Sequence, residues 1–289
     1  MKKIVVLGAG TMGAGIAQAI AEAGFKVILC DIKEEFVQKG IQKIHGNLEK
    51  ALGKGKISPE KKLEVLGNIQ SVVKSGGYAA EGGRSQLADA DLVIEAIVEN
   101  MEIKKGVYQE LDRICSEKTI LASNTSALSI SELAAQTKRP DKVVGMHFFN
   151  PANVMKLVEI TSGAATSTAS NEMVKGFVEK LGKVPIQVME APGFVVNRML
   201  VPLINEAAFI YTEGIASAED IDTAMRLGAG HPIGPLALAD MIGLDVCLAV
   251  METLHAEFGD PKYRPCPILK KMVRAGFLGC KVGKGFYQY

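Results

Sequence analysis

Several features that define other classes of protein are scarce or absent in this sequence. Its 289 residues include no tryptophan, aromatic residues make up 6% of the chain, and no apolar run approaches the roughly 20 residues that a membrane-spanning helix needs. Charges nearly cancel, with 33 lysines and arginines against 32 aspartates and glutamates. The whole molecule is therefore not an electrostatic surface for nucleic acid or membrane, and an anionic partner must bind a local cluster of basic residues.

The cysteines are few, odd in number and widely spaced, with no Cys-x-x-Cys pair. They are Cys30, Cys115, Cys247, Cys266 and Cys280. This spacing favours idle thiols in a reducing compartment over a disulfide framework or a zinc site, and we predict no metal. The first apolar segment begins within the first few residues, which leaves no room for a signal or transit peptide, so we expect a cytoplasmic protein.

The most informative feature is a glycine-rich turn that directly follows the first apolar segment. Residues 2–7 predict a strand, residues 8–13 read Gly-Ala-Gly-Thr-Met-Gly, and an apolar pattern with helical spacing comes next. A second apolar strand then ends on Asp31. This context is typical of a dinucleotide-binding βαβ unit. The predicted cofactor contacts at the turn are Gly8, Gly10, Thr11, Met12 and Gly13.

Each part of this pattern has a physical role. Gly8 permits the tight turn, Gly10 has no Cβ to hold a pyrophosphate away, and Gly13 allows the helix to lie close to the sheet. The anion would bind at the helix N-terminus. Asp31 would accept hydrogen bonds from a ribose diol and repel a 2′-phosphate, which predicts NAD, although the nearby Lys33 leaves NADP open.

A pair of helices is expected next. Helical spacing over 34–52 leads into a glycine-rich loop, and Ser58 followed by proline marks a new helix start. The loop carries Lys54 and Lys56, which could bind phosphate, although exposed lysines are commonly only solvated surface. The two helices would form an antiparallel pair that projects from the sheet.

Further strands place polar residues at one edge of the sheet. Strands are predicted over 69–73, 90–96, 119–123, 143–149, 156–160 and 184–188, with a glycine-rich turn of no assigned function over 74–85. Glu99 and Lys104 follow a central strand, where they could meet the cofactor or serve as helix-start charge and solvated helix surface. Ser126 lies on a strand-to-helix turn at the same edge, whereas Ser129 is explained by a capping box.

One histidine and one glutamate predict an acid–base pair. His147 lies near the end of an apolar strand, and Glu159 interrupts the next apolar strand. A lone histidine in this setting is commonly structural, but a buried carboxylate needs a partner because leaving it unpaired is costly. His147 and Glu159 are therefore expected to contact each other.

The chain divides into two predicted domains, residues 1–190 and 191–289. The segment Ala-Pro-Gly-Phe at 191–194 opens a helix over 195–211, and the remainder has helical patterns. Asn197 and Arg198 stand on the first turn of that helix, at the domain junction, where a ligand crevice is expected.

Several motifs together resemble one family. They are the 8–13 turn with Asp31, Glu-Ala-Ile-Val-Glu-Asn at 95–100, Ser-Asn-Thr-Ser at 123–126, His-Phe-Phe-Asn-Pro at 147–151, Met-Lys-Leu-Val-Glu at 155–159, Pro-Gly-Phe-Val-Val-Asn-Arg at 192–198 and Gly-Lys-Gly-Phe-Tyr at 283–287. Over essentially its full length the chain resembles the 3-hydroxyacyl-CoA dehydrogenases, most closely the short bacterial 3-hydroxybutyryl-CoA type. One departure is the glycine-rich segment at 74–85, which is longer than the family resemblance leads us to expect.

The resemblance implies an α/β fold: a Rossmann-like NAD-binding N-terminal domain with a protruding helical pair, then an all-α C-terminal domain for substrate binding and dimerisation. It implies reversible oxidation of an (S)-3-hydroxyacyl-CoA by NAD, on short chains, in fatty acid or butyrate metabolism. The expected assembly is a homodimer or a larger homo-oligomer, without nucleic acid or membrane partners.

The resemblance also implies residue roles. His147 would exchange the substrate hydroxyl proton, with Glu159 orienting the imidazole, and Ser126 and Asn197 would hydrogen-bond the substrate oxygen. Asn150 would position substrate or nicotinamide. Further implied contacts are Glu99, Lys104, Ser126 and Lys281 for the cofactor, and Lys54 and Lys56 for the coenzyme A phosphates.

Two other functions remain open at this point. One is a β-hydroxyacid dehydrogenase acting on a free acid, a class expected to use a lysine near the start of the C-terminal helical domain, where this chain has Asn197. The other is a non-catalytic NAD-binding sensor, which would have no need of His147, Glu159, Ser126 and Asn197 together.

Overall fold

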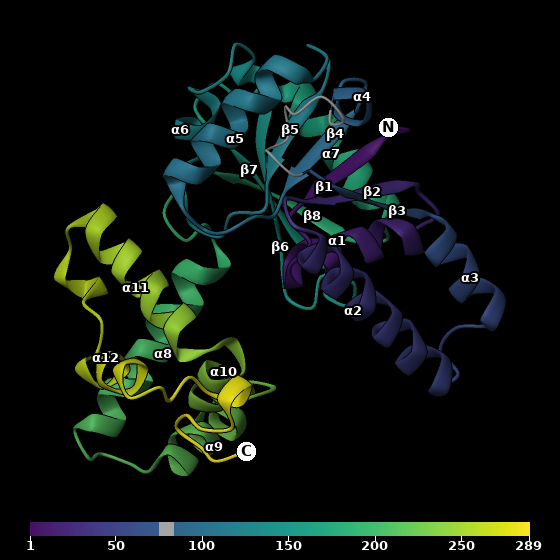
Figure 1. The fold of residues 1–289 in the computed structure, drawn as a ribbon. Helices are drawn as coiled ribbons and strands as arrows, with labels where there is room; N and C mark the ends of the chain where they lie inside the picture. Colours follow the sequence, from purple (N-terminus) through teal and green to yellow (C-terminus); the bar gives the residue numbers. More distant parts are fainter. Residues whose placement is uncertain (75–83) are drawn as a thin grey trace. The chain divides into compact units, whose positions relative to one another are not determined.

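The computed structural model describes residues 1–74 and 84–289 (Figure 1). The glycine-rich turn expected over 74–85 falls, from residue 75 to residue 83, outside the described residues. The chain forms two compact units, Met1–Glu190 and Ala191–Tyr289.

The described part of the first unit is built on an eight-stranded sheet with the order β3-β2-β1-β4-β5-β6-β7-β8. The strands are β1 (Ile4–Leu7), β2 (Val27–Asp31), β3 (Ile69–Val73), β4 (Leu92–Glu95), β5 (Ile120–Ser123), β6 (Val143–Phe148), β7 (Leu157–Ser162) and β8 (Val184–Met189). Neighbouring strands run parallel except β6 and β7, which are antiparallel. The strand order steps outward in both directions from β1 and β4, so the carboxyl ends of these two strands form the switch point at which open α/β sheets bind ligands.

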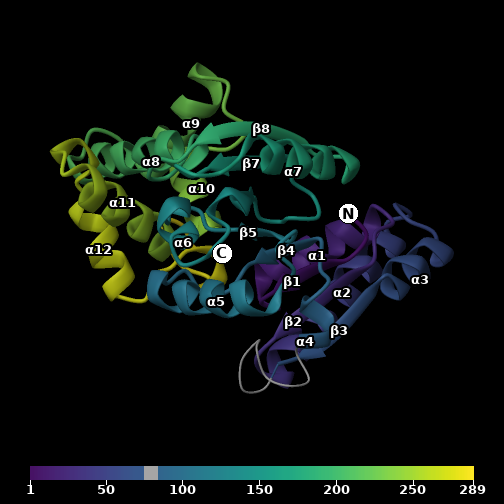
Figure 2. The ribbon, with the colours of Figure 1, turned by 90° about the horizontal axis from the view of Figure 1, so that it is seen from above.

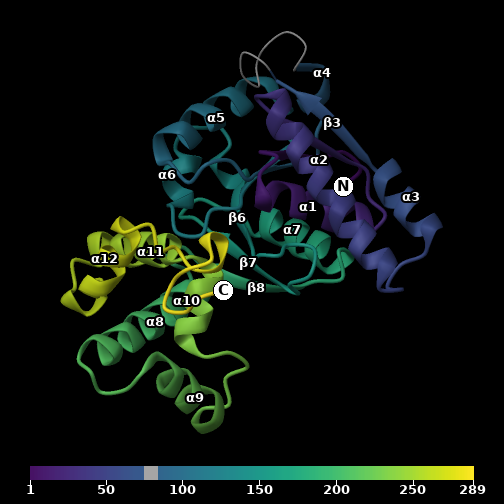
Figure 3. The ribbon, with the colours of Figure 1, turned by 60° about the horizontal axis from the view of Figure 1, so that its bottom comes forward.

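Helices cover both faces of this sheet, as the continuous apolar strands require. They are α1 (Thr11–Glu22), α2 (Glu34–Gly53), α3 (Pro59–Gly67), α4 (Arg84–Leu87), α5 (Met101–Ile114), α6 (Ile130–Ala134) and α7 (Thr168–Lys180), with a 3-10 turn at Pro140–Lys142. Ile4 and Val6 pack into the core under α1, α2 and α7, whereas Val5 and Leu7 pack toward α5 and α6. Figure 3 shows the two groups of helices on either side of the sheet, and Figure 2 shows α7 beside β7 and β8.

The expected helical pair is present as α2 and α3. Ser58 caps α3 by accepting a hydrogen bond from the N–H of Lys61, and Pro59 occupies the first helical position. Lys62 of α3 forms an ion pair with Glu49 of α2. The pair extends beyond the sheet edge in Figure 1.

The second unit is helical, as its sequence predicts. It contains α8 (Val196–Thr212), α9 (Ala218–Gly228), α10 (Pro235–Ile242), α11 (Leu244–Phe258) and α12 (Pro267–Arg274), with 3-10 turns at Pro261–Tyr263 and Cys280–Val282. Its main core forms between α8, α11 and α12, where Ile204, Met251 and Leu269 are fully buried. Within the described ranges, no helix is long and apolar enough to cross a membrane.

Two buried carboxylates hold the C-terminal segment against the second unit. Asp240 accepts hydrogen bonds from the backbone N–H groups of Phe286 and Tyr287, at 3.0 and 2.9 Å. Asp222 accepts one from the Tyr287 hydroxyl at 2.8 Å and two more from the first turn of α10. A Cβ at Gly285 would lie 1.9 Å from an Asp240 oxygen, so only glycine fits in this turn.

All five cysteines are free thiols, as expected. Cys30, Cys115, Cys247 and Cys266 are buried, and burial raises the pKa of the first three to about 12. Cys280 is exposed.

Candidate active site

The glycine turn after β1 has the tight backbone packing that its sequence predicts. Gly8 adopts φ +94°, and a Cβ there would lie 2.4 Å from the carbonyl oxygen of Ala96. A Cβ at Gly13 would lie 1.8 Å from the Gly8 oxygen, so any other residue would push α1 away from the turn. Gly10 has no neighbour within 4 Å of its missing Cβ, which leaves its backbone open to a ligand. The turn therefore fits a dinucleotide pyrophosphate.

Asp31 lies beside this turn at the end of β2. One carboxylate oxygen accepts the backbone N–H of Ala9 at 2.6 Å, and the other accepts that of Ile32 at 2.7 Å. These bonds fix the carboxylate next to the N-terminus of α1, whose first residues are Thr11 and Met12. The N-cap of α1 has no side-chain hydrogen bond, so the first turn offers unpaired N–H groups to an anion.

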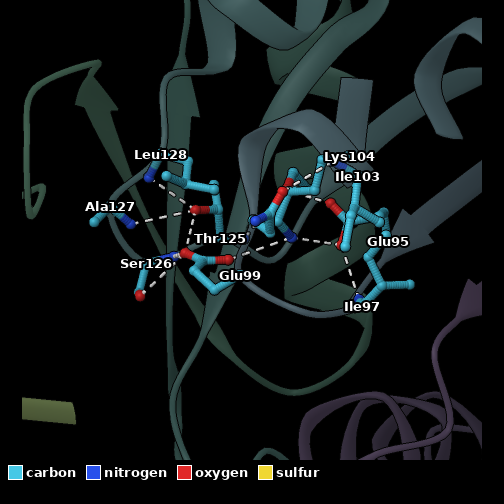
Figure 4. A network of polar contacts seen from close by, with 11 residues as sticks. Glu95, Ile97, Glu99, Ile103, Lys104, Thr125, Ser126, Ala127 and Leu128 are labelled. Carbon is cyan, nitrogen blue, oxygen red and sulfur yellow. Dashed lines mark hydrogen bonds and ion pairs between the residues drawn. The ribbon is translucent and has the colours of Figure 1, made fainter. Parts of the chain in front are cut away.

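A buried ionic network lies at the carboxyl end of β4 (Figure 4). Glu95 is fully buried and accepts hydrogen bonds from Lys104 Nζ at 2.6 Å, the N–H of Ile97 at 2.8 Å and Ser123 Oγ at 2.8 Å. Lys104 Nζ also lies 3.3 Å from Glu99 Oε2. The single ammonium group therefore bridges two carboxylates and balances the charge of the fully buried one, Glu95.

Glu99 connects this network to the turn after β5. Its Oε1 accepts hydrogen bonds from Thr125 Oγ1 at 2.5 Å and from the N–H of Ser126 at 3.0 Å, and Ser126 Oγ lies 3.4 Å away. Its side chain is 41% exposed, whereas that of Lys104 is 1% exposed. Glu99 is therefore the solvent-exposed member of the network. Lys104 and the Thr125–Ser126 turn together fix the position of its carboxylate.

The burial of Lys104 corrects one sequence-based alternative. The interpretation of this lysine as part of a solvated helix surface is wrong, because α5 packs its ammonium group against the end of β4. Sequence reasoning also missed Glu95. The signal was available, since Glu95 ends an apolar strand and needs a partner for the same reason as Glu159.

The expected contact between His147 and Glu159 is confirmed. The two residues are paired in the register of β6 and β7, and Nδ1 of His147 lies 2.6 Å from Oε2 of Glu159. Glu159 is fully buried and His147 is 6% exposed. The imidazole ring also packs on Phe149, with 4.4 Å between ring centroids. A carboxylate at Nδ1 selects the tautomer with the proton on Nδ1, which makes Nε2 the proton-accepting nitrogen of the neutral ring.

The lysines of the α2–α3 loop line a groove of about 410 Å³ in the first unit. Lys54 and Lys56 lie on one side, residues 150–154 lie on the other, and Thr11 of the glycine turn is also part of the lining. The structure thus brings Asn150, which is exposed, onto the same groove as the two lysines.

Further groove residues on α2 were missed from the sequence. Lys43, Asn47 and Lys50 line the same groove, and Lys43 donates a hydrogen bond to Thr11 at 3.0 Å. The spacing of Lys43, Asn47, Lys50 and Lys54 is i, i+4, i+7, i+11, which places them on one helix face. This stripe was visible in the sequence and marks a positively charged surface.

Two predicted site residues belong to the second unit. Asn197 is the second residue of α8 and is half-buried. Lys281 lies in the 3-10 turn near the C-terminus, where its ammonium group contacts both oxygens of Asp245, at 2.5 and 2.6 Å. The joint action of Asn197 with Ser126 and the contact of Lys281 with a cofactor stay predictions.

Comparison with known proteins assigns the chain to a family. Residues 3–191 match the family model described as 3-hydroxyacyl-CoA dehydrogenase, NAD binding domain, and residues 193–289 match the model of the C-terminal domain of the same family.

Individual relatives agree along the whole chain. The 3-hydroxybutyryl-CoA dehydrogenase of Clostridioides difficile is 51% identical over 287 residues, which cover 99% of each protein. The mitochondrial hydroxyacyl-coenzyme A dehydrogenase of Homo sapiens is 42% identical over 292 residues, covering 100% of this chain and 91% of that protein. The crystal structure of (S)-3-hydroxybutyryl-CoA dehydrogenase from Ralstonia eutropha superposes with a TM-score of 0.92 at 47% identity, covering 100% of this chain and 99% of that one. With its NAD-binding domain and its C-terminal domain both matched, the chain belongs to the 3-hydroxyacyl-CoA dehydrogenase family.

Proposed function

We propose that the chain catalyses the reversible oxidation of (S)-3-hydroxybutyryl-CoA to acetoacetyl-CoA with NAD as the cofactor. The observation that carries this proposal is the buried His147–Glu159 pair in a chain of this family. Relatives named as 3-hydroxybutyryl-CoA dehydrogenases at 46–51% identity support the short acyl chain. The product of the oxidation is a β-ketoacyl thioester, which fits a place in fatty acid or butyrate metabolism.

The first unit has the residues to bind the cofactor. The turn at residues 8–13 would cradle the pyrophosphate, and Asp31 would accept hydrogen bonds from the adenosine ribose. Glu99, the exposed end of the buried network, would contact the second ribose, and Lys104 would hold Glu99 in position as well as add positive charge. NAD, when bound, supplies the hydride acceptor of the oxidation.

His147 performs the proton transfer in this proposal. In the oxidation Nε2 accepts the proton of the substrate hydroxyl group, and in the reduction the same nitrogen returns a proton to the ketone oxygen. Glu159 holds the ring through Nδ1 and stabilises the imidazolium that forms. Histidine fits both directions, because its unperturbed pKa lies near neutral pH.

Polar groups at two further places bind the substrate. Ser126 and Asn197 would donate hydrogen bonds to the substrate oxygen on which negative charge develops during reduction. Lys54 and Lys56 would bind the coenzyme A phosphates, and Asn150 would position the acyl part between them and His147. Binding energy from the distant phosphates would then hold the reacting carbon in place.

The assembly and location are also proposed here. We expect a cytoplasmic homodimer, or a larger homo-oligomer, with the dimer contact on the second unit. Sedimentation of the purified protein at several concentrations measures the assembly directly, and a monomer at all concentrations would contradict it.

The decisive experiment follows NADH and NADPH oxidation side by side with acetoacetyl-CoA and with free acetoacetate. The proposal predicts rapid oxidation of NADH with acetoacetyl-CoA. It also predicts slow oxidation of NADH with acetoacetate, and slow oxidation of NADPH with either substrate. Oxidation with acetoacetate alone would instead favour a free-acid dehydrogenase.

A second measurement separates an enzyme from a sensor. Acetoacetyl-CoA should raise the melting temperature of the protein in the presence of cofactor. The protein could instead bind NADH but fail to oxidise it with either acetoacetyl-CoA or acetoacetate. In that case the catalytic assignment of His147 is wrong.

A further inference from the structure

Lys183 is a buried lysine that none of the proposed steps uses. It lies between the end of α7 and the start of β8 and is 8% exposed. Its ammonium group donates hydrogen bonds to the carbonyl oxygens of Ala152 and Met155, both at 2.7 Å. Burying an ammonium group is costly unless it is well paired, so these two bonds define where the side chain can lie.

The segment that Lys183 holds is the connection between β6 and β7. The N–H groups of Val154 and Met155 both bond to the Pro151 carbonyl at 2.9 Å, which makes a single turn without further regular structure. The turn has little apolar burial, since Val154 is 63% exposed and Met155 is 41% exposed. Ala152 is its buried anchor, packed on Gly15 of α1. The bonds from Lys183 are therefore a large part of what fixes this turn.

The same turn forms one side of the lysine-lined groove. Residues 151–154 line the groove together with Lys50 of α2 and Lys54 of the α2–α3 loop, and Asn150 immediately precedes the turn. Movement of the turn would therefore change the width of the groove and the place of Asn150.

The opposite side of the groove is tied to the same region of α1. Asn47 donates a hydrogen bond to Gln18 at 2.9 Å, and Gln18, which is buried, donates one to Glu22 at 2.7 Å. Burial lowers the pKa of Lys183, and the charge of Glu22 opposes this shift. The charge of Glu22 thus favours the protonated ammonium that donates both hydrogen bonds to the turn.

We propose that Lys183 is a positioning residue for the acyl-CoA substrate. Its ammonium group holds the 151–155 turn in place and so sets the width of the groove that the lysines of α2 and the α2–α3 loop line. This inference rests on the proposed function of the groove. Lys183 does not touch the reacting atoms in this proposal; it acts through the turn.

The test compares Lys183→Met with Lys180→Met and Lys183→Arg. Lys183→Met removes both hydrogen bonds while keeping most of the side-chain length, and Lys180, the exposed last residue of α7, is the matched control. With acetoacetyl-CoA and NADH, Lys183→Met should raise KM for acetoacetyl-CoA about tenfold, the loss expected for one or two charge-assisted hydrogen bonds. Both kcat and KM for NADH should change by no more than about twofold. Lys183→Arg, which can still donate, should recover most of the loss.

Calorimetric binding of free coenzyme A separates this inference from the proposed function. If the wild-type protein fails to reduce acetoacetyl-CoA, the proposed function is wrong, and the coenzyme A affinity of each variant still decides the role of Lys183. Equal affinity in wild type and Lys183→Met would overturn the inference. A lower kcat, raised KM values for both acetoacetyl-CoA and NADH and a lower melting temperature, without rescue by arginine, would show a purely structural lysine and overturn it too. Should Lys183→Met not fold, Lys183→Gln, which retains one donor group, provides the same comparison.

Discussion

His147 and Glu159 occupy directly opposed positions in β6 and β7, so their 2.6 Å contact is built into an antiparallel backbone pairing. These are the two strands of the sheet that run antiparallel to each other, and the pairing needs no loop to bring the side chains together. A shift of one residue in register would turn one of the two side chains to the other face of the sheet. The geometry of the acid–base pair therefore depends on sheet register as much as on the two residues.

His147→Gln should abolish turnover while leaving cofactor binding nearly intact. Glutamine cannot exchange a proton at neutral pH, so kcat should fall by about 10²- to 10⁴-fold, the usual contribution of general acid–base catalysis. Stopped assays with acetoacetyl-CoA and fluorescence titration with NADH measure the two properties. Retention of most activity would show that another group moves the proton.

Glu159→Gln should act on kcat through the histidine. The amide oxygen can still accept the Nδ1 hydrogen bond, but the negative charge that stabilises the imidazolium is lost. We expect kcat to fall at least about tenfold with little change in KM for NADH. Circular dichroism serves as the folding control, because Glu159 is fully buried. An unchanged kcat in a folded variant would show that the charge of Glu159 does not contribute to catalysis.

Lys54→Ala should raise KM for the acyl-CoA more than it lowers kcat. Its charge lies on the groove and would bind a phosphate far from the reacting carbon, so its loss removes binding energy rather than chemistry. Lys39→Ala is the matched control, since Lys39 is exposed on α2, the helix that ends just before Lys54, and is not part of the groove lining. Equal KM values for the two variants would place coenzyme A elsewhere.

Asp31→Asn should weaken the preference for NADH over NADPH. The amide oxygen can still accept the N–H of Ala9, although the bond from Ile32 is lost, and the neutral side chain no longer repels a 2′-phosphate. We expect the ratio of kcat/KM values for NADH and NADPH to fall by about tenfold, an electrostatic change of roughly 1.4 kcal/mol. A ratio that stays constant would mean that Asp31 supports the glycine turn without selecting the cofactor.

Thiol labelling of the native protein should modify Cys280 first. It is the exposed cysteine, whereas burial raises the pKa of Cys30, Cys115 and Cys247 to about 12, so few of those thiols are ionised at pH 8. Labelling with a thiol-specific disulfide reagent should show one fast equivalent per chain, and the Cys280→Ser variant should lack it. Several fast equivalents would indicate opening of the core around the buried thiols.

Much of the architecture follows from local patterns in the sequence. The expected strands all form, Ser58 and Ser129 cap the helices that their spacing predicts, and the second helical unit is present. These features depend on residues close together in the chain. The contact of His147 with Glu159 could also be predicted, because a buried carboxylate limits the possible partners and the chain contains few histidines.

The positions that the sequence did not predict depend on packing between distant segments. Lys104 is buried only because α5 lies over the ends of β4 and β5, and Glu95 gains its partners from α5 and from Ser123 of a neighbouring strand. The helical spacing of Lys43 and Lys50 was visible, but the groove that gives the spacing its meaning forms only when residues 150–154 lie opposite. The local patterns of Glu95 and of the α2 lysines therefore indicate special positions, but their partners and the groove are set by tertiary packing.

The anchoring of the C-terminal segment by Asp222 and Asp240 has a practical consequence for protein engineering. Removal of the last four residues would take away the Phe286 and Tyr287 N–H groups and the Tyr287 hydroxyl, leaving two carboxylates in the interior with fewer donors. Truncated forms should therefore express poorly, whereas an affinity tag attached after Tyr289, which is exposed, leaves these hydrogen bonds in place. The final residues of this chain supply hydrogen-bond donors to two buried carboxylates, so purification strategies need to preserve them.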